Sequence, residues 1–290
     1  MTSPPNKLDP AQPSALAALF AQHGFRPKKR LGQNFLISPA VADHIVAVAQ
    51  LSSEDNVLEI GAGAGALTLR LAQLAGEVVA VELDREVLPI LAEVIAPYSV
   101  RVLPEDVLKI DLGALLGEGR WKVLGNLPYY ITGPILGKLM ERRQQVALLV
   151  AMMQKEVADR IASPPGSKEY GSLSVIAQAF FVVRREMVVK RANFYPKPEV
   201  DSAVVSLTPR SQAAVPAAQE ARFTQLVKAA FAHRRKTLEN SLVDAQFVTS
   251  RAQAVEALER AEIGAGRRAE SLSVAEFATL VGQLNEDDNH

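Results

Sequence analysis

The ten residues NVLEIGAGAG, numbers 56–65, decide the fold of this chain. A short apolar strand, expected at 56–60, runs directly into a turn in which alternate residues are glycine. Glycine carries no Cβ atom, so the backbone can turn tightly and a ligand can approach it closely. An amphipathic helical pattern then continues to about residue 74. The stretch therefore predicts the first strand–turn–helix unit of a ligand-binding α/β sheet.

The same alternation of strand and helix continues outward from this unit. Further strands are expected at 77–83, 100–104, 121–126 and 146–153, and helices at about 39–50, 85–96, 134–142 and 173–179. Buried apolar strands that alternate with helices are typical of a mostly parallel, Rossmann-like sheet covered on both faces. The last two expected strands, 180–189 and 202–209, have no helix between them. They predict an antiparallel hairpin edge.

The pattern divides the chain into four parts. Within residues 1–24, we expect a mobile tail at 1–13 and a short helix at 15–23. Residues 25–209 form the α/β domain, and 210–219, rich in Ala, Pro, Gln and Ser, form a linker. Only helical periods occur in 220–284, so the part 220–290 is expected to be a small all-helical domain with an RNA-binding role.

Composition excludes several classes of protein. The 290 residues include no cysteine, which excludes disulfides, thiol catalysis and cysteine-ligated zinc. The four histidines are scattered without metal-ligand spacing, so no metal site is predicted. The chain has no apolar run long enough to cross a bilayer and begins with a polar, proline-rich segment. We expect a cytoplasmic protein that does not contact a membrane and works as a monomer.

The net charge of zero hides an uneven distribution of charge. Residues 54–111 carry seven more acidic than basic side chains, whereas 184–243 carry six more basic than acidic ones. A neutral chain with such a distribution can still present a cationic face to phosphate. The candidate RNA contacts are Arg26, Lys28, Lys29, Arg30, Lys197, Arg234, Arg235 and Lys236. The alternative is that these cations only solvate the surface.

The glycine turn and the next strand predict a nucleoside-containing cofactor. Glu82 lies 21 residues after Gly61, at the end of the second strand, where a carboxylate can accept hydrogen bonds from ribose hydroxyls. NAD enzymes and S-adenosylmethionine (AdoMet) methyltransferases share this arrangement. The G-x-G-x-G spacing and the acidic surroundings favour the cationic AdoMet over a pyrophosphate. Asp106, after the third strand, is placed to accept from an adenine amine or to cap a turn.

The tetrapeptide Asn126-Leu127-Pro128-Tyr129 follows the fourth strand, at the sheet edge where such folds bind ligands. The Asn126 side-chain oxygen and the Leu127 carbonyl can accept both N–H groups of an exocyclic amine. This directs the nitrogen lone pair towards a methyl donor. Pro128 stiffens the loop, and Tyr129 offers a face for an extruded base. Phe194 is a candidate for the opposite face of that base, or a core aromatic.

Taken together, the motifs resemble those of one family, the KsgA-type ribosomal RNA small-subunit adenine N6-dimethyltransferases. The matching stretches run in order from about 25 to 280: KRLGQNFL (29–36), residues 59–68, NLPY (126–129), QKEV (154–157), YGSLSV (170–175), the segment 194–202, and F-x-x-RRKTL (231–238). Tyr130 departs from the pattern, because asparagine is frequent there.

The resemblance implies transfer of four methyl groups from AdoMet to two adjacent adenines near the 3′ end of 16S rRNA. It places Gln33, Asn34 and Leu36 around the methionine end of the cofactor and Gly61 against it. Glu82 would hold the ribose, Asp106 the adenine amine, and Asn126 would lie between cofactor and target. The cofactor site it implies also contains Gly63, Leu83 and Val107.

Three alternatives remain at this point. A large-subunit RNA methylase shares most of these motifs, although the helical region 249–284 favours the small-subunit branch. A non-catalytic RNA-binding assembly or transcription factor shares the fold, although the intact glycine turn and Asn126–Tyr129 argue against lost activity. A nicotinamide oxidoreductase is disfavoured by the glycine spacing.

Overall fold

The computed structural model describes residues 8–233, 236–264 and 266–285. They fall into two compact units, which lie within Met1–Ala158 with Arg184–Pro209 and within Asp159–Val183 with Arg210–His290. The sequence placed 159–183 with the α/β domain, whereas the structure groups this segment with the C-terminal helices. The reason is packing, since the Phe180 ring lies edge-on to the Phe223 ring at 6.2 Å between centroids.

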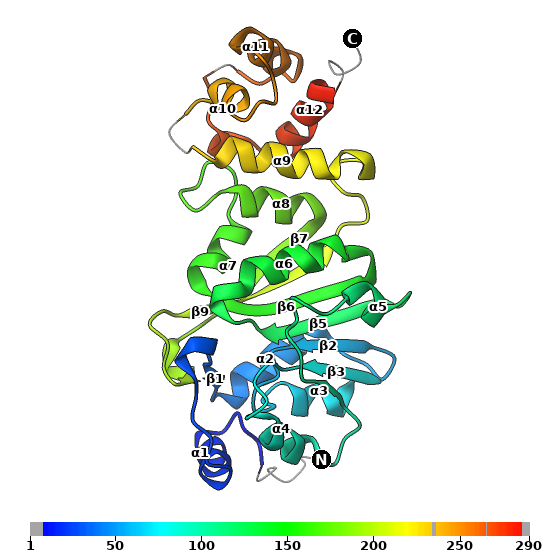
Figure 1. Ribbon diagram of the computed structural model, residues 1–290, viewed down its shortest axis with the longest axis vertical. Helices are drawn as coiled ribbons and strands as arrows, with labels where there is room; N and C mark the ends of the chain where they lie inside the picture. The colour runs from blue at the N-terminus through cyan, green and yellow to red at the C-terminus, as the bar shows by residue number, and fades with distance from the viewer. Residues whose placement is uncertain (1–7, 234–235, 265, 286–290) are drawn as a thin grey trace. The chain divides into compact units, whose positions relative to one another are not determined.

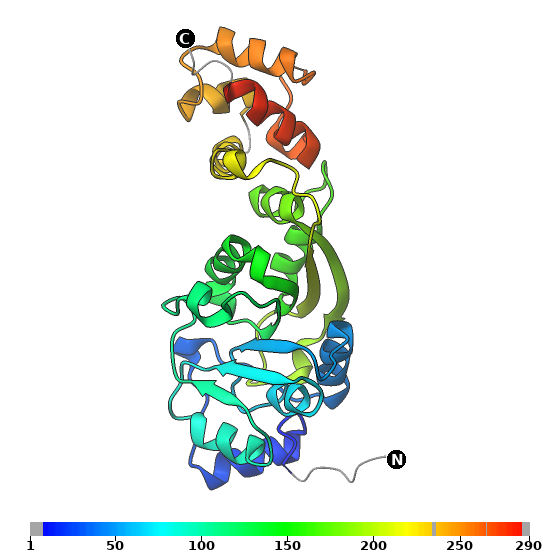
Figure 2. The same ribbon diagram turned by 90° about the vertical axis from the view of Figure 1, so that its right-hand side faces the viewer.

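The central sheet confirms the predicted α/β class. Its order is β4-β3-β2-β5-β6-β9-β7. The strands are β2 (Asn56–Ile60), β3 (Glu77–Val81), β4 (Arg101–Leu103), β5 (Trp121–Asn126), β6 (Val146–Gln154), β7 (Phe181–Val189) and β9 (Ser202–Pro209). The first five in this order pair in parallel, and β9 lies antiparallel to β6. Figures 1 and 2 show helices on both faces of the sheet.

The helices of the α/β part are α2 (Pro39–Ala49), α3 (Thr68–Leu74), α4 (Leu88–Ile95), α5 (Leu112–Leu116) and α6 (Thr132–Glu141). Helix α7 (Lys155–Ala162) begins in this part and ends in the segment grouped with the second unit. Pro39 is the first residue of α2, as predicted. The sequence analysis missed α5, which is short. Its N-terminal signal is Asp111, whose side chain accepts from the backbone N–H groups of Gly113 and Ala114.

Two very short strands were also missed. β1 (Phe35–Leu36) and β8 (Phe194–Tyr195) pair antiparallel, with Phe35 opposite Tyr195 and Leu36 opposite Phe194. Two-residue strands have no periodicity to detect, and these two lie far apart in the sequence. The pair brings the QNFL motif beside the 194–198 segment.

The expected mobile tail through residue 13 is wrong for the part that the structure describes. Asp9, Pro10 and Ala11 are buried, and helix α1 spans Pro13–Gln22. Both Asp9 carboxylate oxygens accept hydrogen bonds from the Arg70 guanidinium at 3.0 Å. A composition rich in proline and poor in apolar residues cannot reveal such an anchor, because its partner is 61 residues away.

The second unit contains α8 (Ser172–Phe180). Its described residues beyond 220 are helical, as predicted, and form α9 (Glu220–Phe231), α10 (Leu238–Asp244), α11 (Arg251–Arg260) and α12 (Val274–Asn285). The expected linker 210–219 is packed rather than free. Val215 is buried, and the Ala214 N–H donates to the Ala179 carbonyl of α8 at 2.9 Å.

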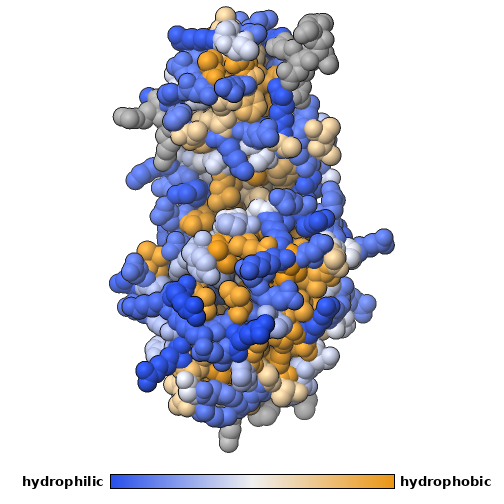
Figure 3. All heavy atoms as spheres, in the orientation of Figure 1, coloured by the Kyte–Doolittle hydropathy of each residue, from blue (hydrophilic) through white to orange (hydrophobic). Residues whose placement is uncertain are grey.

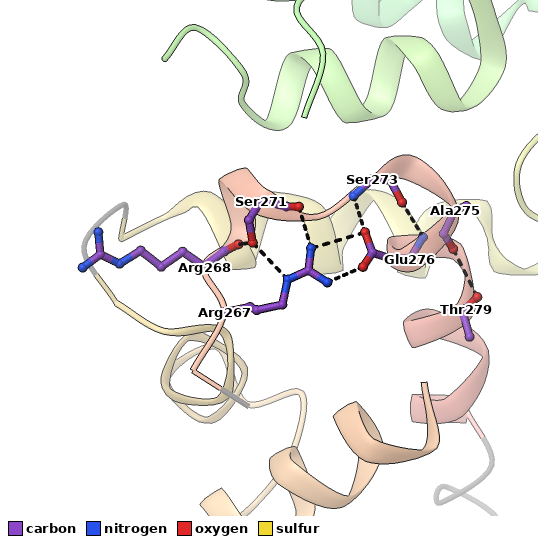
Figure 4. Close-up of polar contacts among 7 residues, drawn as sticks. All are labelled: Arg267, Arg268, Ser271, Ser273, Ala275, Glu276 and Thr279. Carbon is purple, nitrogen blue, oxygen red and sulfur yellow. Dashed lines mark hydrogen bonds and ion pairs between the residues drawn. The ribbon is translucent and has the colours of Figure 1, made fainter. Parts of the chain in front are cut away.

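A capping box and the Arg267 side chain stabilise the start of α12 (Figure 4). The Ser273 N–H donates to Glu276 Oε2 at 2.7 Å and the Glu276 N–H to Ser273 Oγ at 3.2 Å, which is a capping box. Arg267 pairs with Glu276 and donates to the Ser271 carbonyl. Arg268 points away from this cluster in Figure 4. The charge of Arg267 is therefore used within the fold.

On the face drawn in Figure 3, hydrophobic side chains show between hydrophilic ones over the α/β elements. None of the helices within the described ranges is long and apolar enough to span a membrane.

Candidate active site

The carboxyl ends of β2, β3, β4 and β5 border one open pocket. The sheet order reverses between β2 and β5, because β3 and β4 lie on one side of β2 and β6 lies beyond β5. Loops that leave such a switch point diverge to opposite faces and create a crevice for ligands. The fold thus places the pocket where the sequence analysis expected the cofactor.

All the predicted cofactor residues reach this pocket, although they come from five separate stretches of sequence. They are Gln33, Asn34, Leu36, Gly61, Gly63, Glu82, Leu83, Asp106, Val107 and Asn126. Leu127, Pro128 and Tyr129, predicted for the chemistry, line it as well. Their common location supports one site for cofactor and target.

The glycine turn needs glycine for its backbone geometry. Gly61 has φ +78° and Gly63 has φ +54°, conformations that other residues adopt at a cost. A Cβ atom on Gly61 would lie 3.4 Å from the Asn126 carbonyl oxygen, and one on Gly63 would lie 3.2 Å from the Phe35 ring. The turn therefore forms a closely fitted cradle.

Acidic side chains follow the ends of β3 and β4. Glu82 accepts the Gly63 N–H at 2.8 Å through Oε2. Burial raises the pKa of Glu82, while backbone hydrogen bonds from Asp84 and Gly63 lower it. Asp106 caps its own turn by accepting from the Leu108 N–H at 3.0 Å, and it also lines the pocket. Both interpretations of Asp106 from the sequence are compatible with this placement.

The end of β5 holds its polar groups in fixed orientations. The Asn126 amide donates through Nδ2 to the Asn34 carbonyl at 2.9 Å, which leaves Oδ1 as the acceptor end. The Tyr129 hydroxyl lies 2.6 Å from Ser202 Oγ. The Pro128 carbonyl already accepts from the Ile131 N–H and from Thr132 Oγ1, each at 3.1 Å. These hydrogen bonds thus fix the orientation of Asn126, the Pro128 carbonyl and Tyr129.

The sequence analysis did not assign a role to Glu59, which lines the pocket near the end of β2. Its side chain is buried, and Oε2 has no hydrogen-bond partner. Burial, with a smaller contribution from the charge of Glu82, raises the pKa of Glu59 to about 7. An acidic residue within a buried strand, directly before the glycine turn, was the available signal.

Glu59 predicts a pH-dependent stability. Because its pKa in the folded chain is raised from 4.5 to about 7, the folded state binds an extra proton between these values. The free energy of unfolding should therefore fall as pH rises from about 5 to 8, by on the order of 3 kcal/mol. Urea unfolding at about pH 5 and pH 8 measures this difference, and Glu59→Gln should remove most of it. An equal slope in both proteins would exclude Glu59 as its source.

Two predicted roles are not supported by the geometry. Phe194 was expected to stack on a base, but it is 2% exposed, faces Leu36 across the β1–β8 pair and does not line the pocket. The other interpretation, a core aromatic, is the one observed. Lys28 was expected to contact phosphate, but its ammonium is bonded to Asp84 at 2.7 Å and to Glu86 at 2.8 Å.

The remaining predicted RNA contacts differ in what holds them. Arg26, Lys29, Arg30 and Lys197 are exposed, and within the ranges that the structure describes they form no ion pair. Lys236 is ion-paired with Asp244. Arg234 and Arg235 lie outside the described residues.

Comparisons with known proteins agree along almost the whole chain. Residues 24–286 match the family described as ribosomal RNA adenine dimethylase. Ribosomal RNA small subunit methyltransferase A of Anoxybacillus flavithermus is 45% identical over 284 residues, which cover 95% of this chain and 96% of the relative. The protein of the same name from Pelotomaculum thermopropionicum is 46% identical over 281 residues, 93% of this chain and 95% of the relative.

Two solved structures have the same fold. A dimethyladenosine transferase from Plasmodium falciparum is 25% identical with a TM-score of 0.76, covering 87% of this chain and 98% of its own. The 23S rRNA methyltransferase ErmE is 25% identical with a TM-score of 0.70, covering 87% and 100%. With its methyltransferase-type pocket and a family match that covers most of its length, this chain is a member of the ribosomal RNA adenine dimethylase family.

Proposed function

We propose that the chain dimethylates the N6 amines of two adjacent adenines near the 3′ end of small-subunit (16S) ribosomal RNA, with AdoMet as methyl donor. One observation carries the proposal: the Asn126 amide, with Oδ1 as its acceptor end, lies beside the glycine cradle in a pocket that contains every expected cofactor residue. The names of the relatives, which are small-subunit methyltransferases along 93–95% of this chain, support the choice of RNA.

The pocket suits AdoMet chemically. Its wall includes Glu59, Glu82, Glu105 and Asp106, a set that favours a ligand with positive charge. The buried Glu59 oxygen without a partner calls for a hydrogen-bond donor. Glu82 keeps acceptor capacity for ribose hydroxyls, and Asp106 for the adenine amine. When bound, AdoMet supplies an electrophilic methyl group on a sulfonium.

The protein's contribution to the reaction is orientation of the target amine. The lone pair of an exocyclic amine is delocalised into its ring. Asn126 Oδ1 accepts one N–H, and the Leu127 carbonyl accepts the other, because the Pro128 carbonyl is already used within the loop. The two acceptors localise the lone pair and aim it at the donor. Tyr129, braced by Ser202, provides a face for the extruded base.

The test of the proposal is transfer of tritium-labelled methyl groups from AdoMet to unmethylated small subunits, with large subunits as the parallel substrate. We expect label in the small subunits alone, recovered as N6,N6-dimethyladenosine after digestion. Label in the large subunits alone would favour the ErmE-like alternative. Binding of small subunits without any transfer would favour a non-catalytic assembly factor.

The exposed cations of the first unit are the proposed contacts to RNA phosphate. Replacing Lys29, Arg30 and Lys197 together by alanine should weaken RNA binding and flatten its dependence on salt, by roughly one unit of log–log slope for each phosphate that is no longer neutralised. Filter binding over a series of salt concentrations measures this slope. Arg101→Ala is the matched control, since Arg101 is exposed at the amino end of β4, away from the pocket. An unchanged slope in the triple variant would place the RNA elsewhere.

We also propose that the protein works as a cytoplasmic monomer. In support, one chain supplies the whole pocket wall, with residues from 10 to 131. Sedimentation velocity of the active protein tests this, and activity that tracks a dimer would contradict it.

A further inference from the structure

Asp84 does not line the pocket, yet its carboxylate holds part of the pocket wall. Its side chain is 4% exposed. Oδ1 accepts from Lys28 Nζ at 2.7 Å, and Oδ2 accepts from Gln33 Nε2 at 2.7 Å. The Gln33 side chain turns back and accepts the Lys28 N–H at 2.7 Å through Oε1. Asp84, Lys28 and Gln33 thus form a closed ring of three hydrogen bonds.

Two of these residues belong to a segment that borders the pocket. The lid segment, as we name residues 28–36, contributes Leu31 to Leu36 to the pocket wall. It contains little regular structure: a single 3-10 turn at Lys29–Leu31, Gly32 with φ +60°, and the two-residue strand β1. Such a segment depends on side-chain contacts for its position. Its far end is held by the Asn126 amide, which donates to the Asn34 carbonyl.

Asp84 is also joined to the cofactor end of the pocket. The Asp84 N–H donates to Glu82 Oε1 at 2.8 Å, and Glu82 Oε2 accepts the Gly63 N–H at 2.8 Å. A continuous set of hydrogen bonds therefore runs from the glycine turn through Glu82 and Asp84 to the lid segment. Every bond in it is 2.8 Å or shorter, and Asp84 is its midpoint.

We propose that Asp84 is a positioning residue that fastens the lid segment over bound AdoMet through Lys28 and Gln33. This rests on the proposed use of AdoMet. Asp84 sets how long the cofactor is retained and does not take part in methyl transfer. The cation of Lys28 serves this contact, which explains why a residue expected to bind RNA is turned inward. The second ion-pair partner of Lys28 is Glu86, whose side chain is 69% exposed and which lies outside the ring.

Asp84→Asn tests the proposal with little change in shape, because one oxygen becomes an amide donor that faces a donor of the lid segment. We expect the Kd for AdoMet, measured by calorimetry on the full chain, to rise at least tenfold. Methyl transfer at saturating AdoMet should stay within threefold of wild type, which separates positioning from catalysis. Amide hydrogen exchange of residues 28–36 without ligand should become faster, while that of β6 stays unchanged.

Lys28→Met is the second variant, because it removes the cation from the ring and leaves the Asp84–Gln33 hydrogen bond in place. It should raise the Kd in the same direction by a smaller factor. The double variant should bind no more weakly than Asp84→Asn alone, because both remove the same ring. Glu86→Gln is the matched control and should leave the Kd within twofold.

The proposal is overturned if Asp84→Asn keeps wild-type affinity for AdoMet, or if it loses methyl transfer at saturating AdoMet while affinity is kept. It is also overturned if exchange in the lid segment does not change. The same calorimetry separates this from the proposed function: wild-type chain that binds no AdoMet defeats both, whereas wild-type binding with an unaltered Asp84→Asn defeats only the role of Asp84.

Discussion

Replacing Asn126 by alanine is expected to lower methyl transfer at saturating AdoMet by about a hundredfold or more, an effect much larger than the loss of AdoMet affinity caused by releasing the Asn34 carbonyl. Removing one preorganised hydrogen-bond partner of a reacting group costs on the order of 3 kcal/mol in comparable sites. The Asn126 amide is already oriented by the Asn34 carbonyl, at 2.9 Å, so little reorganisation occurs at reaction. Without its acceptor, the target amine is held by the Leu127 carbonyl alone.

The measurement is single-turnover transfer of tritiated methyl to unmethylated small subunits, with the AdoMet Kd determined separately. Asn56→Ala is the matched control, because Asn56 begins β2 at the opposite end of the sheet. It should transfer methyl at the wild-type rate. If Asn126→Ala turns over within threefold of wild type, the paired-acceptor mechanism is wrong.

Gly61→Ala is expected to weaken AdoMet binding by about tenfold or more and to destabilise the fold. Backbone strain causes this effect, and a steric clash does not. The new methyl group would lie 3.4 Å from the Asn126 carbonyl oxygen, which is an ordinary contact distance. Holding a residue with Cβ at φ +78° costs roughly 1–2 kcal/mol. The turn can relieve that strain only by moving, which takes it out of the geometry that receives the cofactor.

Calorimetry gives the AdoMet Kd, and urea unfolding should show a loss of about 1–2 kcal/mol. Gly137→Ala in α6 is the control, since a Cβ at Gly137 meets nothing within 4 Å. In a helix interior this change should stabilise the fold by up to about 1 kcal/mol. An unchanged AdoMet Kd in Gly61→Ala would mean that the turn does not touch the cofactor.

The sequence predicted the strands of the sheet well because their signals are local. The runs at 56–60, 121–126 and 202–209 coincide with β2, β5 and β9. A buried parallel strand needs a continuous apolar run, and the residues predicted to bind the cofactor and the target, Gly61 and Asn126, lie at the carboxyl ends of two such strands. The chain order of strands and the position of the switch point then place those residues together.

Contacts distant in sequence could not be predicted in the same way. Phe194 has an aromatic side chain of the kind that stacks on bases, and only its pairing with Leu36 places it in the core. Lys28 has a cationic side chain of the kind that contacts phosphate, and only the hydrogen bond to Asp84, 56 residues later, turns its ammonium group inward. The burial of Asp9 by Arg70 and the packing of 210–219 against α8 belong to the same class.

The sequence predicted the α/β class, the glycine turn and the acceptor loop, because each depends on the residue types in a short stretch, and the family resemblance predicted residues that line the pocket. The tertiary structure alone decided which charges are free to meet RNA and which serve the fold. It also decided the protonation behaviour of Glu59, because burial raises the pKa of this side chain to about 7. The physical reason is the same throughout: local geometry follows from neighbouring residues, whereas burial and ion pairing follow from partners that only folding brings close.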